Sequence, residues 1–126
     1  MHDDHYVSTQ GSEASLAQSQ LLKGTTSLLV LAVLRDGELY GYEIAARIRD
    51  RSGAFIDPGE GWLYPALHRL ETEGALEASW RESAIGPRRR YYRLTHKGSQ
   101  MLDAQASEWE SFAGSVRNVM LGRSGA

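Results

Sequence analysis

An apolar heptad repeat in the C-terminal part of the chain restricts the possible folds more than any other feature of the sequence. Apolar side chains recur there in steps of four and three residues, which is the spacing of one helix face. A helix over residues 96–121 would span about 39 Å at 1.5 Å per residue, which is longer than a small domain can cover. We therefore expect its far end to pack against a second copy of the chain in a two-fold homodimer, rather than to cover only its own domain. The expected dimer-interface residues are Leu102, Ala106, Trp109, Ala113, Val116 and Met120.

Three apolar segments precede this repeat, and each is followed by a glycine that favours a helix C-terminus. The first segment is apolar around most of its circumference, so we expect this helix to be buried on several sides. Gly37, Gly53 and Gly74 are placed to end the three helices. Pro65 is expected in about the first turn of the third helix, where the loss of a backbone N–H matters least. The expected ranges are 21–34, about 41–52 and about 62–73.

A β-hairpin is expected between the third helix and the heptad repeat. The segments 76–81 and 88–94 have the character of strands and flank a loop that contains Gly86 and Pro87. Thr95 then stands where its hydroxyl can cap the final helix. Three short helices, a two-stranded hairpin and a further helix follow the plan of a winged helix-turn-helix, which is an α+β fold that is mainly α.

Basic residues are concentrated in one short segment, although the whole chain has a net charge of −2. The segment 81–97 holds six basic residues and one acidic residue. Such a local excess is typical of a nucleic-acid contact, and a solvated strand is the alternative. Strand alternation places Arg89 and Arg93 on the outer face. Among the hairpin arginines, we favour Arg88 and Arg89 as contacts to the DNA backbone. Arg90 begins on the core side, where it can pair with an acid, and its role stays open.

The expected organisation is therefore one folded unit with flexible ends. Residues 1–18 are rich in Ser, Gln, Asp and His without apolar periodicity, which is typical of a mobile arm. We expect the winged helix-turn-helix DNA-binding domain over residues 19–95 and the dimerisation helix over 96–121. A short flexible tail is expected over 122–126.

Several classes of function are excluded by what the sequence lacks. Because there is no cysteine, a disulfide scaffold, a thiolate nucleophile and a Cys-ligated metal are ruled out. The four histidines form no metal-binding pair with a carboxylate, and neither a phosphate loop nor a nucleophile elbow is present. We therefore expect no enzyme activity, no metal and no cofactor. The longest apolar run, 28–34, is too short for a membrane helix, and the N-terminus does not resemble a secretory signal. A cytoplasmic protein without a membrane partner is expected.

Five spaced segments form one specific pattern: 22–24 (LKG), 39–44 (LYGYEI), 63–71 (LYPALHRLE), 74–76 (GAL) and 86–95 (GPRRRYYRLT), together with Gly98. This pattern resembles the PadR family of bacterial transcriptional regulators over about residues 21–121. The single terminal helix is similar to the short subfamily. The resemblance implies a homodimeric repressor that releases double-stranded operator DNA when a small, often aromatic, effector binds. A winged domain that contacts only other proteins is the competing function, and it predicts a neutral hairpin.

The resemblance also implies roles for individual side chains. The third helix is implied to enter the major groove, and Tyr42 can donate its hydroxyl to a phosphate or pack in the corner between two helices. Trp109 and Phe112 are the expected effector-binding residues, with a plain interface anchor as the alternative for Trp109. The expected DNA-binding residues are Tyr42, Tyr64, Pro65, His68, Arg69, Arg88 and Arg89.

The chain departs from the family pattern at two positions. Trp62 stands where Ser or Thr is usual ahead of the Leu-Tyr-Pro segment. Either Gly61 caps the third helix, or Trp62 packs at the entrance of this helix. Tyr40 stands where a His is common, and the sequence assigns no role to its side chain.

Overall fold

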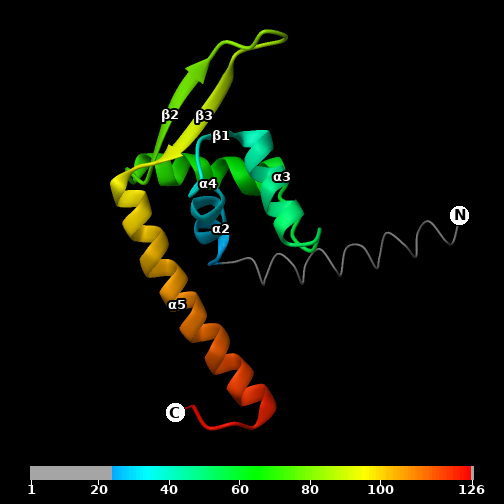
Figure 1. The fold of residues 1–126 in the computed structure, drawn as a ribbon, viewed down its shortest axis with the longest axis vertical. Coiled ribbons are helices and arrows are strands. Elements are labelled where there is room, and N and C mark those ends of the chain that lie inside the picture. The colour runs from blue at the N-terminus through cyan, green and yellow to red at the C-terminus, as the bar shows by residue number, and fades with distance from the viewer. Residues whose placement is uncertain (1–23, 126) are drawn as a thin grey trace, which may run out of the picture.

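The computed structural model describes residues 24–125, so the expected arm over 1–18 and the first residues of the first expected helix lie outside the described residues. Among these residues, no helix combines the length and the apolar character that are needed to cross a membrane. The order of helices, hairpin and terminal helix is the expected one (Figure 1). The elements are α2 (Thr26–Val33), β1 (Leu39–Tyr40), α3 (Gly41–Arg51), α4 (Glu60–Thr72), β2 (Leu76–Arg81), β3 (Arg89–Leu94) and α5 (His96–Leu121).

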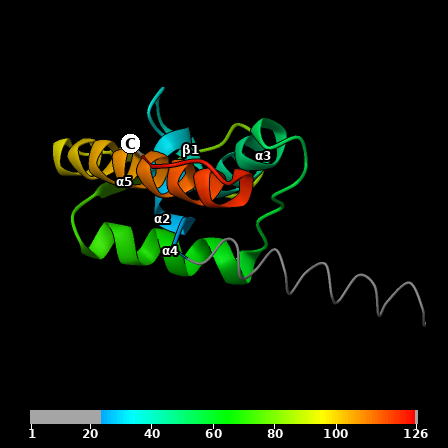
Figure 2. The same cartoon turned by 90° about the horizontal axis from the view of Figure 1, so that it is seen from below.

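The hydrophobic core is built around α2. Val30 and Leu31 of this helix are fully buried, and apolar side chains from the other helices and the sheet pack around them. α2 contacts α3, α4 and α5, and the view from below shows α4 beside it (Figure 2). The expectation that the first helix is buried on several sides is therefore confirmed. The remaining core residues are Val33, Leu34, Leu39, Ile44, Ile48, Leu63, Ala66, Leu67, Leu70, Ala75, Leu76, Tyr92 and Leu102.

Glycines end two of the three short helices as expected. Gly53 follows α3 with φ 63° and Gly74 follows α4 with φ 82°, a left-handed backbone that glycine adopts without strain. The expectation for Gly37 was wrong, because α2 already ends at Val33, with Leu34 as its C-cap. The N–H groups of Leu34 and Arg35 bond three residues back, to the carbonyls of residues 31 and 32. These tight turns stop the helix before Gly37 is reached.

The helix α4 begins earlier than expected. Gly59 is its N-cap, and the Gly59 carbonyl accepts from the N–H groups of Trp62 (3.1 Å) and Leu63 (2.9 Å). Trp62 is half-buried against the core, so it packs at the helix entrance, and Gly61 is not the cap. Pro65 consequently lies in the second turn rather than the first. Because proline has no N–H, it cannot donate to the Gly61 carbonyl one turn back.

The sheet has three antiparallel strands in the order β1-β3-β2. β2 and β3 form the expected hairpin, in which Arg81 lies opposite Arg89, and this hairpin projects away from the helices (Figure 1). β1 pairs Leu39 with Tyr92 and Tyr40 with Tyr91. The alternating pattern in the sequence predicts only β2 and β3, because a strand of two residues such as β1 is too short to show alternation.

Thr95 caps α5 as expected. Its hydroxyl oxygen accepts from the Gly98 N–H (3.0 Å), and its hydroxyl donates to the Gly74 carbonyl (2.6 Å). Gly98 lies so close to the turn between α4 and β2 that an added Cβ would stand 2.1 Å from the Ala75 carbonyl oxygen. The start of α5 is therefore fixed against the end of α4. From there α5 runs away from the other helices (Figure 1).

Leu102 was wrongly assigned to the dimer interface. Its side chain is 2% exposed within its own chain, where it belongs to the core. This heptad position lies near the domain, so the domain covers it and a partner cannot reach it. Further along the repeat, Trp109, Val116 and Met120 are 42%, 40% and 78% exposed. Ala106 and Ala113 are half-buried.

Candidate nucleic-acid interface

The helix α4 has one buried face and one exposed face. Its buried face consists of Leu63, Ala66, Leu67 and Leu70. Tyr64, Pro65, His68 and Arg69 are exposed. The structure therefore brings the four expected α4 residues together on one accessible surface, because positions three and four apart lie on the same side of a helix.

The two tyrosines expected to contact DNA line one cleft. A cavity of about 220 Å³ lies between α3 and α4, and both Tyr42 and Tyr64 are among its lining residues. Tyr64 rests against the first residue of α3, since a Cβ added to Gly41 would stand 2.7 Å from the Tyr64 hydroxyl oxygen. Tyr42 is 68% exposed. The two tyrosines thus meet at one cleft between α3 and α4.

Arg69 makes a contact that the sequence did not indicate. Its Nη2 donates to the Ser27 hydroxyl oxygen at 3.1 Å, which links α4 to the beginning of α2. The residue is exposed, so its remaining N–H groups can still be reached by a ligand. Arg69 is therefore both a surface cation and a tie between two helices.

Three of the five hairpin arginines are paired with carboxylates. Arg81 pairs with Glu38, Arg93 with Glu77, and Arg90 with Glu71 at 2.6 Å. Within residues 24–125, Arg88 and Arg89 make no ion pair with any acid. These are the two arginines that we expected to contact the DNA backbone.

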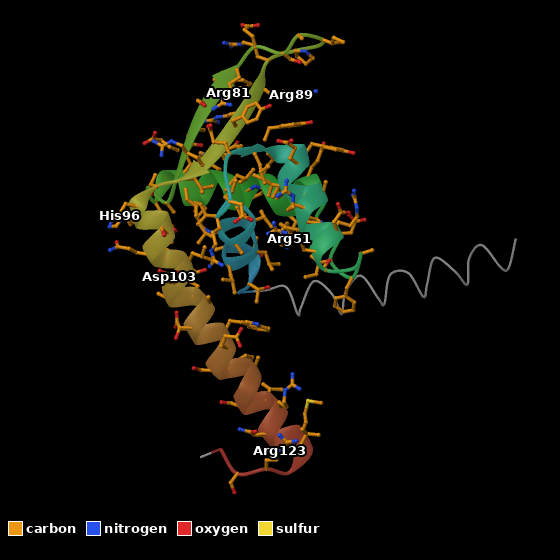
Figure 3. All side chains as sticks on the ribbon, in the orientation of Figure 1. Arg51, Arg81, Arg89, His96, Asp103 and Arg123 are labelled. Atoms are coloured by element: carbon orange, nitrogen blue, oxygen red, sulfur yellow. The ribbon has the colours of Figure 1, made fainter. Side chains whose placement is uncertain are left out.

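Arg88 and Arg89 lie over aromatic rings. The Arg88 guanidinium carbon is 5.2 Å from the centre of the Trp80 ring, and that of Arg89 is 4.5 Å from the Tyr40 ring. A ring attracts a cation but leaves its net charge in place. Both side chains therefore keep a full positive charge on the exposed hairpin, on which Figure 3 labels Arg81 and Arg89.

The structure gives Arg90 a role within the protein. Its ion pair with Glu71 joins β3 to the last turn of α4, and its guanidinium carbon lies 5.7 Å from the Tyr92 ring. The Arg90 Nε is buried and has no hydrogen-bond partner among the described residues. Burial raises the pKa of the Tyr92 phenol above its ordinary value, and the Arg90 charge offsets this only in part. Arg90 thus anchors the hairpin to the proposed recognition helix.

A second cavity lies away from the hairpin, between α2 and α5. It has a volume of about 300 Å³, and Trp109 and Phe112 are part of its lining, with ring centres 6.1 Å apart. The two expected effector-binding residues therefore do meet at one cavity. The sequence did not indicate the other lining residues, because they come from an element far away in the chain or from polar positions of α5. These residues are Gly24, Thr25, Leu28, Gln105 and Glu108.

Comparison with known proteins assigns the family. Residues 30–104 match the model of the transcriptional regulator PadR-like family. This chain belongs to that family. Its members are transcriptional regulators and not enzymes, which confirms the expectation from the sequence.

Individual relatives and solved structures show how far the similarity extends. The negative transcriptional regulator PadR of Bacillus subtilis (strain 168) is 33% identical over 75 residues, which are 58% of this chain and 40% of that protein. A transcriptional regulator from Clostridium thermocellum is 31% identical, with a TM-score of 0.73 over 79% of this chain and 94% of the other. The chain in the crystal structure of Bacillus subtilis PadR in complex with operator DNA has 29% sequence identity to this chain, with a TM-score of 0.57 over 62% of this chain and 44% of that one.

Proposed function

We propose that this PadR-like regulator is a repressor that binds operator DNA through α4 and the hairpin. The observation that carries the proposal is the charge pattern of the hairpin, in which Arg88 and Arg89 are the arginines without an acidic partner in the part of the chain that the structure describes. A phosphate oxygen pair matches the fork of a guanidinium. Support comes from Bacillus subtilis PadR, which is named a negative regulator and whose solved structure contains operator DNA.

A continuous surface joins these arginines to α4. Arg89 lies over the Tyr40 ring, the Tyr40 ring stacks on Tyr42 at 6.4 Å, and Tyr42 shares a cleft with Tyr64 of α4. In this arrangement the hairpin arginines would hold the DNA backbone. The exposed side chains of α4 would then reach the base edges, because phosphate contacts position a protein and base contacts specify the sequence.

The proposed repressor acts as a homodimer held by α5. The far part of this helix exposes apolar side chains that the described residues of its own chain do not cover, among them Val119 (82% exposed) and Met120 (78% exposed). A second copy of the same helix would cover them. Two copies related by a two-fold axis would also present two α4 helices to a DNA site with matching symmetry.

The proposed effector site is the cavity beside Trp109 and Phe112. Its two rings favour a flat molecule, because aromatic stacking adds about 0.5–1.5 kcal/mol beyond the burial of area. Among the described residues that line it, Glu108 is the only charged side chain. We therefore expect a planar cation to bind better than a planar anion. Binding there would release DNA if the effector prefers the arrangement of the two subunits that does not fit the operator.

The DNA part of the proposal is tested by selecting bound fragments from genomic DNA, including the region upstream of the gene itself. Enrichment of a pseudo-palindrome with half-sites about 10 bp apart, or a multiple of this, is the expected result. His68→Ala and Tyr64→Phe should change the preferred sequence. Arg123→Ala removes a charge at the opposite end of the molecule (Figure 3) and should leave the preference unchanged. Failure to enrich any sequence over bulk DNA would favour the protein-contact function instead.

The effector part is tested with two probes of similar shape and opposite charge, N-methyl-4-phenylpyridinium and biphenyl-4-carboxylate. The readout is Trp109 emission in a variant that carries Trp62→Phe and Trp80→Phe, together with release of labelled operator. The cation should quench more strongly and release the operator, and Glu108→Gln should reduce the difference between the probes. Quenching without release would mean that the cavity binds ligands but does not regulate DNA binding.

A further inference from the structure

Tyr40 occupies the point where the hairpin meets the helices. It is the second residue of β1 and pairs with Tyr91 of β3. Its backbone N–H donates to the Glu43 carboxylate at 3.2 Å, which fixes it to the first turn of α3. The backbone of Tyr40 is thus held from two directions, so its half-buried side chain has a defined place.

The ring of Tyr40 is the centre of a cluster of aromatic and cationic side chains. The ring centre of Tyr91 lies 5.5 Å away at an angle of 62°, and that of Tyr42 lies 6.4 Å away at 20°. The Arg89 guanidinium carbon lies 4.5 Å from the Tyr40 ring. Arg81 lies 4.6 Å from the Tyr91 ring. Both hairpin strands and α3 therefore contribute side chains to one cluster.

The partner of Arg89 is an aromatic ring and not a carboxylate. A carboxylate at this place would fix Arg89 but would neutralise its charge, as Glu38 does for Arg81 and Glu77 does for Arg93. The Tyr40 ring attracts the cation and leaves it charged. It also restricts the rotamers of a long side chain, so that less entropy is lost when the guanidinium binds an anion.

We propose that Tyr40 is a positioning residue that holds Arg89, charged and pre-ordered, for contact with a DNA phosphate. The proposal rests on the proposed function, because it needs the hairpin to face DNA. Tyr40 stands where a histidine is common in the family pattern, so this role explains what the tyrosine does at that position. Tyr40 itself is not required to touch DNA.

The first test uses the protein without DNA and does not depend on the proposed function. Ring currents from Tyr40 should shift the NMR signals of the Arg89 side chain. Tyr40→Phe keeps the ring and should preserve the shifts, whereas Tyr40→Leu should remove them. Tyr40→Val is a second ring-free variant that suits a strand, and it serves if Tyr40→Leu does not fold. Unchanged Arg89 signals in a folded ring-free variant would overturn the proposal.

The second test is a double-mutant cycle on operator binding. When Arg89 is present, Tyr40→Leu should weaken binding about two- to fivefold for each Tyr40–Arg89 pair in the complex, which is the range of an exposed cation–π contact. The same change should have little effect in an Arg89→Ala background, and Tyr40→Phe should restore normal binding and its salt dependence. An equal loss in both backgrounds would show a merely structural role and overturn the proposal.

The two proposals fail in distinguishable ways. If Arg89→Ala and Arg88→Ala both leave operator affinity unchanged, the hairpin does not contact DNA, and the role of Tyr40 falls with the proposed function. If Arg89→Ala weakens binding but shows no coupling to Tyr40, the proposed function stands and only the positioning role is overturned.

Discussion

Replacement of Gly98 by alanine should destabilise the fold strongly, although alanine is the better helix former. The new Cβ would stand 2.1 Å from the Ala75 carbonyl oxygen, whereas an ordinary carbon–oxygen contact is about 3.3 Å. The start of α5 must therefore move by roughly 1 Å. The same carbonyl accepts from the Thr95 N–H at 3.1 Å, and Thr95 caps the helix through Gly98, so this movement disturbs both bonds.

The expected magnitude follows from these opposing contributions. Overpacking costs about 1–3 kcal/mol and a weakened cap about 1 kcal/mol, against a gain of about 1 kcal/mol in helix propensity. With a further bond to the Ala75 carbonyl disturbed, we expect a net loss of about 2–4 kcal/mol in the free energy of unfolding.

Urea denaturation followed by circular dichroism, at one fixed protomer concentration, measures this change. Gly114→Ala is the matched control on the same helix, because nothing lies within 4 Å of its added Cβ. This control should gain about 0.5–1 kcal/mol. If Gly98→Ala is as stable as the unmodified chain, the close approach of α5 to the turn before β2 is wrong.

Three further predictions concern the recognition surface, the dimer and the core. Gly41→Ala should push the Tyr64 ring aside and alter the preferred operator sequence. The cost in stability should be small, because the added Cβ meets only the far end of the Tyr64 side chain. Selection of bound DNA fragments measures the change in sequence preference. Val116→Glu should prevent dimerisation in sedimentation experiments, whereas Ser111→Glu, an exposed position of α5 outside the heptad seam, should not. Because the pKa of Tyr92 is raised in the folded state, the folded protein holds the phenol proton of Tyr92 more tightly than the unfolded chain does. The contribution of the protonated phenol to the free energy of unfolding is therefore complete below pH 10 and is lost as the pH rises through the folded pKa. Tyr92→Phe should therefore flatten the fall of the urea midpoint above pH 10.

Sequence reasoning succeeded where the determinant of structure is local. The Thr95 cap and the glycines after α3 and α4 depend on a few neighbouring residues, so the sequence shows them directly. The prediction that Gly37 ends the first helix was wrong, because the chain forms a tight turn before it reaches this glycine. The strand β1 was missed because its pairing with β3, about fifty residues away in the chain, is not visible in two residues.

The sequence predicted which residue types form the candidate DNA-binding surface, but not which arginines pair with acids. The excess of arginine between residues 81 and 97 indicated a nucleic-acid contact, but the acids that neutralise three of these arginines lie elsewhere. Glu71, for example, reaches Arg90 from the helix α4. The heptad repeat likewise cannot separate a position that its own domain covers, such as Leu102, from one that stays exposed, such as Met120. Both distinctions need the tertiary structure.

The salt dependence of operator binding tests the central claim most directly. Each phosphate that a protein neutralises contributes about 0.9 to the slope of log affinity against log salt concentration. In the proposed homodimer, Arg88→Ala combined with Arg89→Ala removes four phosphate contacts, so it should lower the magnitude of this slope by about 3.6 and weaken binding to specific and random DNA alike. The control pair Arg117→Ala and Arg123→Ala, which removes the same charge from α5 and its end, should leave the slope unchanged, with the dimer confirmed by sedimentation. An unaltered slope in the hairpin variant would place the hairpin away from the DNA and contradict the account.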